Sequence, residues 1–349
     1  MAPENPLNNR GQNAGYKLAF LVEANSYNQA ISTAQHPIGG IMKKVNTRYL
    51  TVCLLALLFV GCSIIGTVMA SDNTAVAPGF IGEQGGRGDW PAVAQSRADL
   101  RTHTLYRPVA LPDDPLPLLI WGNGGCSDFG LSHDKFLRDI ASHGYIVIAL
   151  GYAWRQPQRK DPSSREKDAT DVAQMEQAMT WAAERTADPV DELYGHIDVS
   201  RIAVAGHSCG GLQAIKISAD PRISTSIIFD SGVYNRPGSG RSKIEVSKDE
   251  LANLHGPIAY FTGGPSDIAH PNASDDVKRI RHVPVFFGWL PVGHGGTFSA
   301  PDGGDWAEVA VHWLDWQLKE NRAAGSWFLS EDCDLCRDER WTVERFANR

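Results

Sequence analysis

One pentapeptide has the residue types and spacing of a nucleophilic serine site. Residues 206–210 read Gly-His-Ser-Cys-Gly and fit the pattern G-x-S-x-G, with Ser208 at the centre. The apolar segment 201–205 precedes the motif, and a helical pattern of small residues starts at Gly210. A sharp strand-to-helix turn needs small neighbours, and a helix N-terminus directs N–H groups toward a developing anion. The sequence therefore predicts Ser208 as a nucleophile, in preference to a plain structural turn.

A serine hydroxyl needs a base and an acid that orients the base. His294 lies between glycines, just after the apolar segment 283–289. Asp267 follows the apolar segment 258–262 through a Gly-rich exit. In an architecture with this strand–serine–helix turn, the chain order is Ser, acid, His, with the acid and the base on loops after later strands. Asp230, at the end of the preceding apolar segment, is the alternative acid, or else a turn former.

Stabilising a tetrahedral oxyanion requires backbone N–H donors from two loops. We expect one donor from Cys209, the residue after the nucleophile. Residues 121–126 read Trp-Gly-Asn-Gly-Gly-Cys and follow an apolar segment, and their glycines let the backbone approach a substrate. The second donor is therefore expected at Asn123 or Gly124, and a tight turn without a catalytic part is the alternative.

Apolar, β-branched runs alternate along the chain with segments of helical periodicity. Continuous apolar runs are typical of parallel strands that are buried on both faces. The alternation predicts an α/β fold with a mostly parallel central sheet and helices on both of its faces. The expected strands are 102–106, 116–121, 145–150, 201–205, 225–229, 258–262 and 283–289, and the expected helices are 133–142, 168–187, 210–219, 273–280 and 306–319.

The composition excludes several classes of protein. With 349 residues, of which 42% are hydrophobic and 21% charged, the chain is neither low-complexity nor wholly disordered. Its net charge is −7, from 33 Lys+Arg and 40 Asp+Glu, and it has no long basic tract. A nucleic-acid partner is therefore not expected. The motifs imply neither a metal ion nor an organic cofactor.

The N-terminal part has the pattern of an export signal. Three basic residues precede the apolar run that starts at Leu50, and a small-x-Ala-like exit ends at Ala70. This order predicts a signal peptide over 42–70, with cleavage after Ala70. Residues 1–41 are polar and unpatterned, so we interpret them as a spurious or disordered leader.

An exported chain without an anchor would be secreted or periplasmic and would keep no stable membrane association after cleavage. The alternatives are an uncleaved apolar span over 49–68 and lipidation at Cys62. Residues 71–349 contain no evident linker or repeat, so we expect one catalytic domain with a short Cys-containing C-terminal tail.

The ordered set of serine turn, Asp loop, His loop and Gly-rich loop resembles the α/β-hydrolase superfamily. Segment 137–152, LRDIASHGYIVIALGY, is similar to secreted cutinase-like and dienelactone-hydrolase-like esterases. The resemblance implies that Ser208, His294 and Asp267 form a triad that cleaves carboxylic esters through an acyl-enzyme. Cys209 stands where cutinase-like enzymes commonly carry Met, and this departure argues against a polyester hydrolase, which stays an alternative.

Four cysteines follow the expected signal, and an even number in an exported chain is compatible with disulfides. The sequence alone permits three connectivities. In the fold that the resemblance implies, the loops of Cys126 and Cys209 are neighbours, so we predict a disulfide between them. Cys333 and Cys336 form an isolated C-x-x-C, which favours a local disulfide over zinc.

The connection at 231–256, where many lipases carry a lid, is short and rich in Gly and Ser. We therefore expect little or no lid and an open cleft. Tyr152, Trp154 and Trp289 lie at strand ends and are candidates to line this cleft, with packing in the core or rim as the alternative.

These patterns together predict a secreted serine esterase that acts on a small-molecule or polymeric ester. A peptidase or an acyltransferase with the same triad is an alternative. A non-enzymatic binding protein is disfavoured because it would need none of the three catalytic side chains. The sequence leaves the oligomeric state open.

Overall fold

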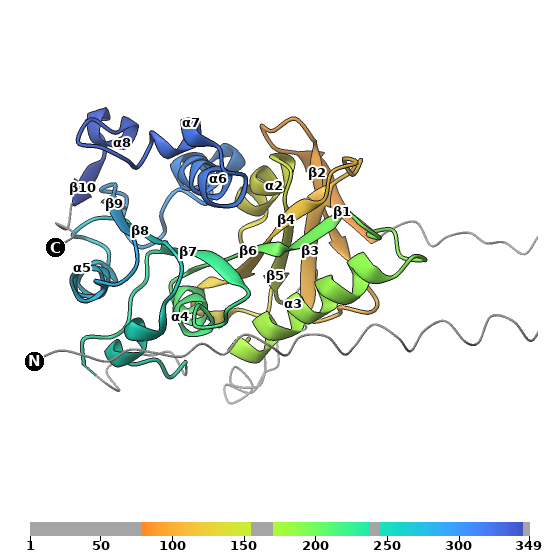
Figure 1. Cartoon of the computed structure of the whole chain (residues 1–349), viewed down its shortest axis with the longest axis horizontal. Coiled ribbons are helices and arrows are strands. Elements are labelled where there is room, and N and C mark those ends of the chain that lie inside the picture. Colours follow the sequence, from red (N-terminus) through yellow and green to blue (C-terminus); the bar gives the residue numbers. More distant parts are fainter. Residues whose placement is uncertain (1–78, 155–169, 237–243, 345–349) are drawn as a thin grey trace, which may run out of the picture. The chain divides into compact units, whose positions relative to one another are not determined.

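Within the described residues, strands that are far apart in the sequence pair into a single sheet of ten strands (Figure 1). The computed structural model describes residues 79–154, 170–236 and 244–344, so the expected leader and signal peptide lie outside the described residues. The strands are β1 (Gly79–Gly85), β2 (Ala92–Ser96), β3 (His103–Pro108), β4 (Leu116–Gly122), β5 (Ile146–Leu150), β6 (Ile197–His207), β7 (Ile223–Phe229), β8 (Ile258–Thr262), β9 (Val285–Trp289) and β10 (Thr342–Glu344).

The strand order is β1-β2-β3-β5-β4-β6-β7-β8-β9-β10. The six central strands, from β5 to β9 in this order, are all parallel, whereas β1, β2 and β3 at one edge and β10 at the other pair antiparallel. The prediction of a mostly parallel sheet is confirmed. The parallel strands bring their carboxyl ends to one edge of the sheet, where ligand sites of open α/β sheets lie.

Helices cover both faces of this sheet (Figure 1). They are α2 (Asp134–Ser142), α3 (Val172–Ala187), α4 (Cys209–Ile217), α5 (His270–Arg279), α6 (Gly304–Leu318) and the short α7 (Arg322–Gly325) and α8 (Asp334–Arg337). Because successive strand side chains point to opposite faces, Leu119 and Trp121 pack with α2 and α6, whereas Leu118 and Ile120 pack with α3, α4 and α5.

The start of α3 illustrates how local chemistry sets an element's bounds. The apolar pattern predicted a helix from residue 168, but the structure starts it at Val172. Asp171 accepts a hydrogen bond from the Gln174 N–H, and the Gln174 side chain accepts one from the Asp171 N–H. This reciprocal capping box satisfies the first N–H groups of the helix and fixes where it begins.

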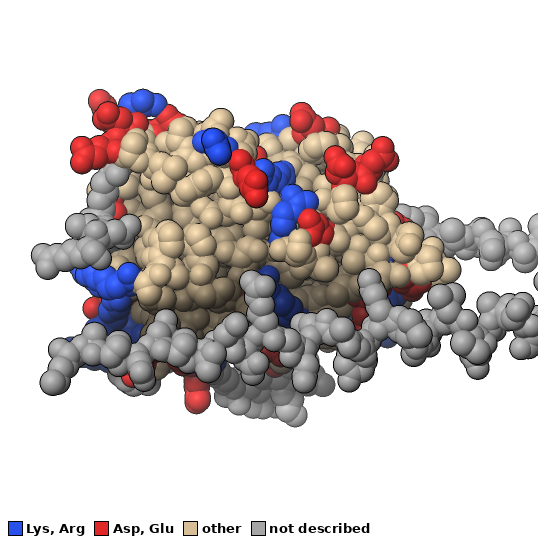
Figure 2. Space-filling model, viewed as in Figure 1, with Lys and Arg blue, Asp and Glu red and all other residues tan. Residues whose placement is uncertain are grey.

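The connection between β7 and β8 contains the 3₁₀ helix η3 (Lys248–Asn253) in its described part. Across the described residues, no helix combines the length and the apolar character that a membrane span requires. Figure 2 shows acidic and basic side chains in mixed groups on one face, with uncharged residues between them.

The C-terminal segment, which the sequence indicated only as a short tail, completes the sheet. Residues Thr342–Glu344 pair with β9, and Trp341 and Leu335 are buried in the same core as α6. A disulfide joins Cys333 to Cys336 at the start of α8, with a Cα–Cα distance of 4.9 Å.

Candidate active site

The turn between β6 and α4 holds Ser208 in a backbone conformation that L-residues rarely adopt, with φ 54 and ψ −117. The glycines around it permit a very close approach of three segments. A Cβ on Gly210 would lie 2.0 Å from the Gly122 carbonyl oxygen, and one on Gly206 would lie 2.2 Å from the Gly210 carbonyl oxygen. The G-x-S-x-G pattern is therefore a packing requirement that presents the serine hydroxyl at the sheet edge.

Ser208, His294 and Asp267 lie in one hydrogen-bonded row. The Ser208 Oγ is 2.9 Å from His294 Nε2, and His294 Nδ1 is 2.6 Å from Asp267 Oδ1. Each residue follows a different parallel strand, namely β6, β9 and β8. The His294 side chain is 31% exposed while the Asp267 side chain is 0% exposed, so the ring is open to a substrate and its partner carboxyl is not.

Backbone donors hold Asp267 in place. The Ala269 N–H donates to Oδ1 at 2.9 Å and the Gly263 N–H lies 3.2 Å from Oδ2. Burial pushes the pKa of Asp267 up, but hydrogen bonds from His294 and Ala269 outweigh it and leave the pKa below its usual value. Asp267 is thus an ionised partner for the imidazole at neutral pH.

Two further side chains support the row, and neither was assigned a specific role from the sequence. The Nε2 of His207 is 2.9 Å from the His294 carbonyl oxygen, which ties the histidine loop to the serine turn. The Ser231 hydroxyl donates to the Ser208 carbonyl oxygen at 2.6 Å. Burial lowers the pKa of His207 to about 4, so its ring is neutral and donates through Nε2.

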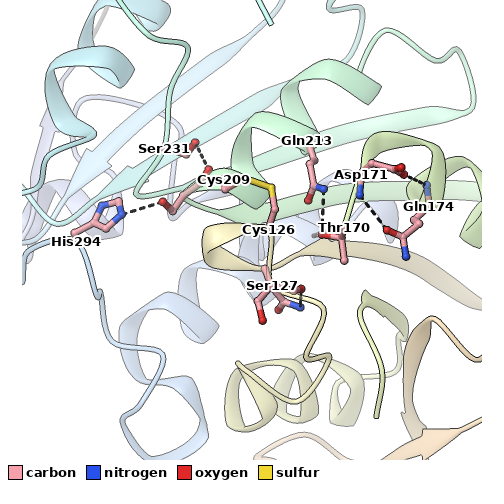
Figure 3. Close-up of a disulfide and its surroundings, with 11 residues drawn as sticks. Cys126, Ser127, Thr170, Asp171, Gln174, Cys209, Gln213, Ser231 and His294 are labelled. Atoms are coloured by element: carbon pink, nitrogen blue, oxygen red, sulfur yellow. Dashed lines mark hydrogen bonds between the residues drawn. A yellow bond between two sulfur atoms is a disulfide. The ribbon is translucent and has the colours of Figure 1, made fainter. Parts of the chain in front are cut away.

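The Gly-rich loop after β4 forms the 3₁₀ helix η1 (Gly124–Cys126) and lies against the start of α4. The predicted disulfide is present: Cys126 and Cys209 have a Cα–Cα distance of 5.2 Å (Figure 3). A Cβ on Gly210 would come within 2.7 Å of the Asn123 N, so the two loops expected to supply oxyanion donors are in contact. Figure 3 shows His294 on the other side of the same turn.

Asn123 and Gly124 differ in what surrounds them. The Asn123 side chain is buried at 0% exposure, accepts from Trp121 Nε1 at 2.9 Å and donates to the Leu150 carbonyl oxygen at 2.6 Å. Gly124 packs against the His207 ring, where a Cβ would lie 2.4 Å from Nδ1. The asparagine side chain therefore fixes the loop, and the oxyanion donors that we expect from this loop are backbone N–H groups.

The three aromatic residues expected to line the cleft lie at two separate places in the structure. Tyr152 and Trp154 lie after β5 with rings 5.6 Å apart, and Trp154 is 45% exposed. The backbone of Tyr152 pairs with Phe129, beside the Gly-rich loop. Trp289 instead ends β9 and packs against His270 and under Gly264 of the acid loop.

The alternative acid, Asp230, is also at this centre. It directly follows β7 with φ 45 and 0% exposure, and it lies behind Asp267 rather than on the histidine. From the sequence, Asp230 and Asp267 were alternatives for the acid of the triad. The fold places both carboxyl groups at this centre.

The sheet order and the strand–turn–helix at Ser208 define the class of protein: the chain has the α/β-hydrolase fold. A family model described as Chlorophyllase matches residues 114–251, and this family is one of α/β-hydrolase-type esterases. The chain is accordingly a hydrolase of carboxylic esters. The matched segment includes the Gly-rich loop and Ser208 and ends before Asp267 and His294. The comparison with curated proteins found no match.

Proposed function

We propose that the chain is an exported serine esterase with Ser208 as nucleophile, His294 as general base and acid, and Asp267 as the carboxylate that orients the imidazole. The observation that carries this proposal is the continuous row from the Ser208 Oγ through His294 to Asp267, with distances of 2.9 and 2.6 Å. With its proton on Nδ1 toward Asp267, His294 has Nε2 available to accept the serine proton.

The reaction then follows in two steps. Ser208 attacks the ester carbonyl, His294 takes the hydroxyl proton and passes it to the leaving alcohol, and an acyl-enzyme forms. Water, activated by the same imidazole, releases the acid. The oxyanion is stabilised by the N–H of Cys209, at the first turn of α4, and by that of Asn123 or Gly124.

Export of the chain is part of the proposal. The basic, apolar and small-residue order over 42–70 supports a cleaved signal, and two disulfides in the described part suit an oxidising compartment. The mixed charges on the face in Figure 2 fit an uncharged ester better than a nucleic acid.

Hydrolysis of p-nitrophenyl acetate and butyrate by wild type and Ser208→Ala tests the proposal. Removing the nucleophile is expected to lower kcat by about 10⁴-fold or more. Because the matching family is that of chlorophyllase, chlorophyll belongs in the ester panel together with a polyester. Equal rates for both proteins would refute the nucleophile, and cleavage of peptides but of no ester would replace the esterase by a peptidase. Product transferred to an added alcohol would indicate an acyltransferase.

A further inference from the structure

A second buried carboxyl group lies directly behind the row of Ser208, His294 and Asp267. Asp230 is 0% exposed, its Oδ1 accepts from the Gly263 N–H at 2.7 Å and its Oδ2 accepts from Trp306 Nε1 at 3.1 Å. The same Gly263 N–H lies 3.2 Å from Asp267 Oδ2. The two carboxyl groups therefore meet at one N–H, toward which each turns an oxygen.

A hydrogen bond between two carboxyl groups requires one proton, because two carboxylates have only acceptors. Two buried negative charges this close would also repel each other strongly. Either Asp230 or Asp267 therefore carries the proton, and the groups that surround each carboxyl determine which of the two it is.

Asp267 has the surroundings of the ionised partner. It accepts from His294 Nδ1 and from the Ala269 N–H on Oδ1, and the imidazole that faces it becomes positive during the reaction.

Asp230 has the surroundings of the neutral partner. The titratable groups that face it in the described residues are Asp267 and His207, whose Nε2 is 3.9 Å from Asp230 Oδ2. His207 is neutral, since its Nε2 is bonded to the His294 carbonyl oxygen and burial lowers its pKa. Burial and the charge of Asp267 raise the pKa of Asp230 to about 9. Within the part of the chain that the structure describes, no cation faces Asp230 to offset a negative charge on it.

We infer that Asp230 is a positioning residue that acts as a neutral carboxylic acid and donates a hydrogen bond to the Asp267 carboxylate. This inference rests on the proposed function of Asp267 and His294. The donated bond completes the set of donors on Asp267 and keeps Oδ1 turned toward His294, without adding a second charge beside it. A carboxylic acid that stays neutral in an apolar site and donates a hydrogen bond has precedent in enzyme chemistry.

The kinetic test compares Asp230→Asn, Asp230→Val and Asp267→Asn by kcat and KM on p-nitrophenyl butyrate. Asp230→Asn retains a donor and an acceptor, so activity within about 3-fold of wild type is expected. Asp230→Val removes the donor, and kcat should fall by about 10²-fold from misorientation while KM stays nearly constant. Asp267→Asn should cost about 10⁴-fold. If Asp230→Asn loses as much as Asp267→Asn, or if Asp230→Val matches wild type, the inference is wrong.

The pH profile gives a readout that a merely structural role would not move. Above pH of about 9, wild-type Asp230 should lose its proton, and with it the donated bond, so kcat/KM should decline there. Asp230→Asn cannot ionise and should lack this alkaline decline. An identical decline in both proteins would contradict the inference.

A stability measurement separates this inference from the proposed function because it needs no activity. The folded pKa of Asp230 lies above its unfolded value, so wild type loses stability as pH rises from about 4 to about 9. The Tm of Asp230→Asn minus that of wild type should therefore grow steadily up to pH 9. A difference that is flat from pH 6 to 9 would overturn the neutral Asp230.

Asp276 offers a matched control at another fully buried carboxyl group. Its Oδ1 is 2.5 Å from Lys248 Nζ, and burial raises its pKa to about 6. The Tm difference for Asp276→Asn should therefore stop changing above pH of about 6. If the wild-type protein hydrolyses no ester but the two Tm profiles differ as stated, the proposed function fails and the neutral Asp230 stands.

Discussion

Ser208 adopts a backbone conformation with φ 54, which costs a non-glycine residue about 1–3 kcal/mol. The surrounding structure maintains it through close glycine contacts and through the Ser231 hydroxyl bonded to the Ser208 carbonyl oxygen. The backbone strain is thus located at Ser208, the residue that carries the nucleophilic hydroxyl. The G-x-S-x-G pattern was enough to predict this turn, because only glycine fits the contacts that the turn makes.

Adding a methyl group at Gly210 tests this packing. A Cβ there would lie 2.0 Å from the Gly122 carbonyl oxygen, so Gly210→Ala must push the Gly-rich loop away from α4. We expect a loss of about 1–3 kcal/mol of unfolding free energy and at least tenfold in kcat. Gly295→Ala is the control, since a Cβ there meets nothing within 4 Å although it neighbours His294. Similar losses in both variants would argue against the packing explanation.

Two partly buried histidines beside the site predict acid sensitivity. Burial lowers the pKa of His133 to about 3 and that of His207 to about 4, both well below their usual value. The unfolded chain takes up protons below pH 6.5 while the folded chain does not, so stability is lost as pH falls from about 6.5 to 4. Each ring contributes a slope of about 1.4 kcal/mol per pH unit.

His133→Phe should reduce that slope, because it keeps ring packing on Trp121 and Phe298 and removes one titrating group. Urea unfolding of wild type and variant at pH 7, 6, 5 and 4 measures the slopes. Parallel slopes would show that His133 takes up its proton at the same pH in the folded and the unfolded chain.

At the scale of elements, the disulfide between Cys126 and Cys209 fixes the Gly-rich loop to the start of α4. It closes a loop with a sequence separation of 83, which in the chain-entropy model is worth about 4–5 kcal/mol. Replacing both cysteines by serine should lower the Tm markedly and lower kcat more than it raises KM. Replacing both Cys333 and Cys336, which are 3 residues apart, should have a much smaller effect. Equal effects of the two double variants would contradict this account.

The central strands could be predicted from the sequence because each is a continuous apolar run. Segment 258–262 is observed as β8 with the same bounds. The edge strands carried no such signal. β1 is mostly exposed and contains three glycines, and β10 is only three residues long and is held by pairing with β9. Pairing across the chain creates these edges, so local pattern could not reveal them.

Some residues of the site could likewise be predicted from the sequence, and others could not. Ser208, Asp267 and His294 follow apolar strands in a characteristic order, and this made them visible in the sequence. The contacts of Trp306 with Asp230, and of His207 with the His294 carbonyl oxygen, join distant segments and have no local motif. Predicting them requires the packed structure.

At the scale of the whole molecule, the described residues (79–154, 170–236 and 244–344) form one compact unit. We predict that the exported protein starts at Ser71 and that the remaining chain folds and hydrolyses esters by itself. N-terminal sequencing and the intact mass of protein recovered from outside the producing cells measure this start. A product that retains residues 1–41, or one that carries a lipid on Cys62, would contradict the proposed signal cleavage.

The most direct measurement is covalent trapping by a fluorophosphonate ester, which reacts with an activated serine nucleophile. Incubation of the wild-type protein should add one phosphonyl group, located by peptide mass spectrometry on Ser208, together with complete loss of ester hydrolysis. Ser208→Ala should remain unmodified, and His294→Ala should react far more slowly because the hydroxyl has lost its base. Modification of a different residue, or equal labelling of wild type and Ser208→Ala, would contradict the assignment of Ser208 as the nucleophile.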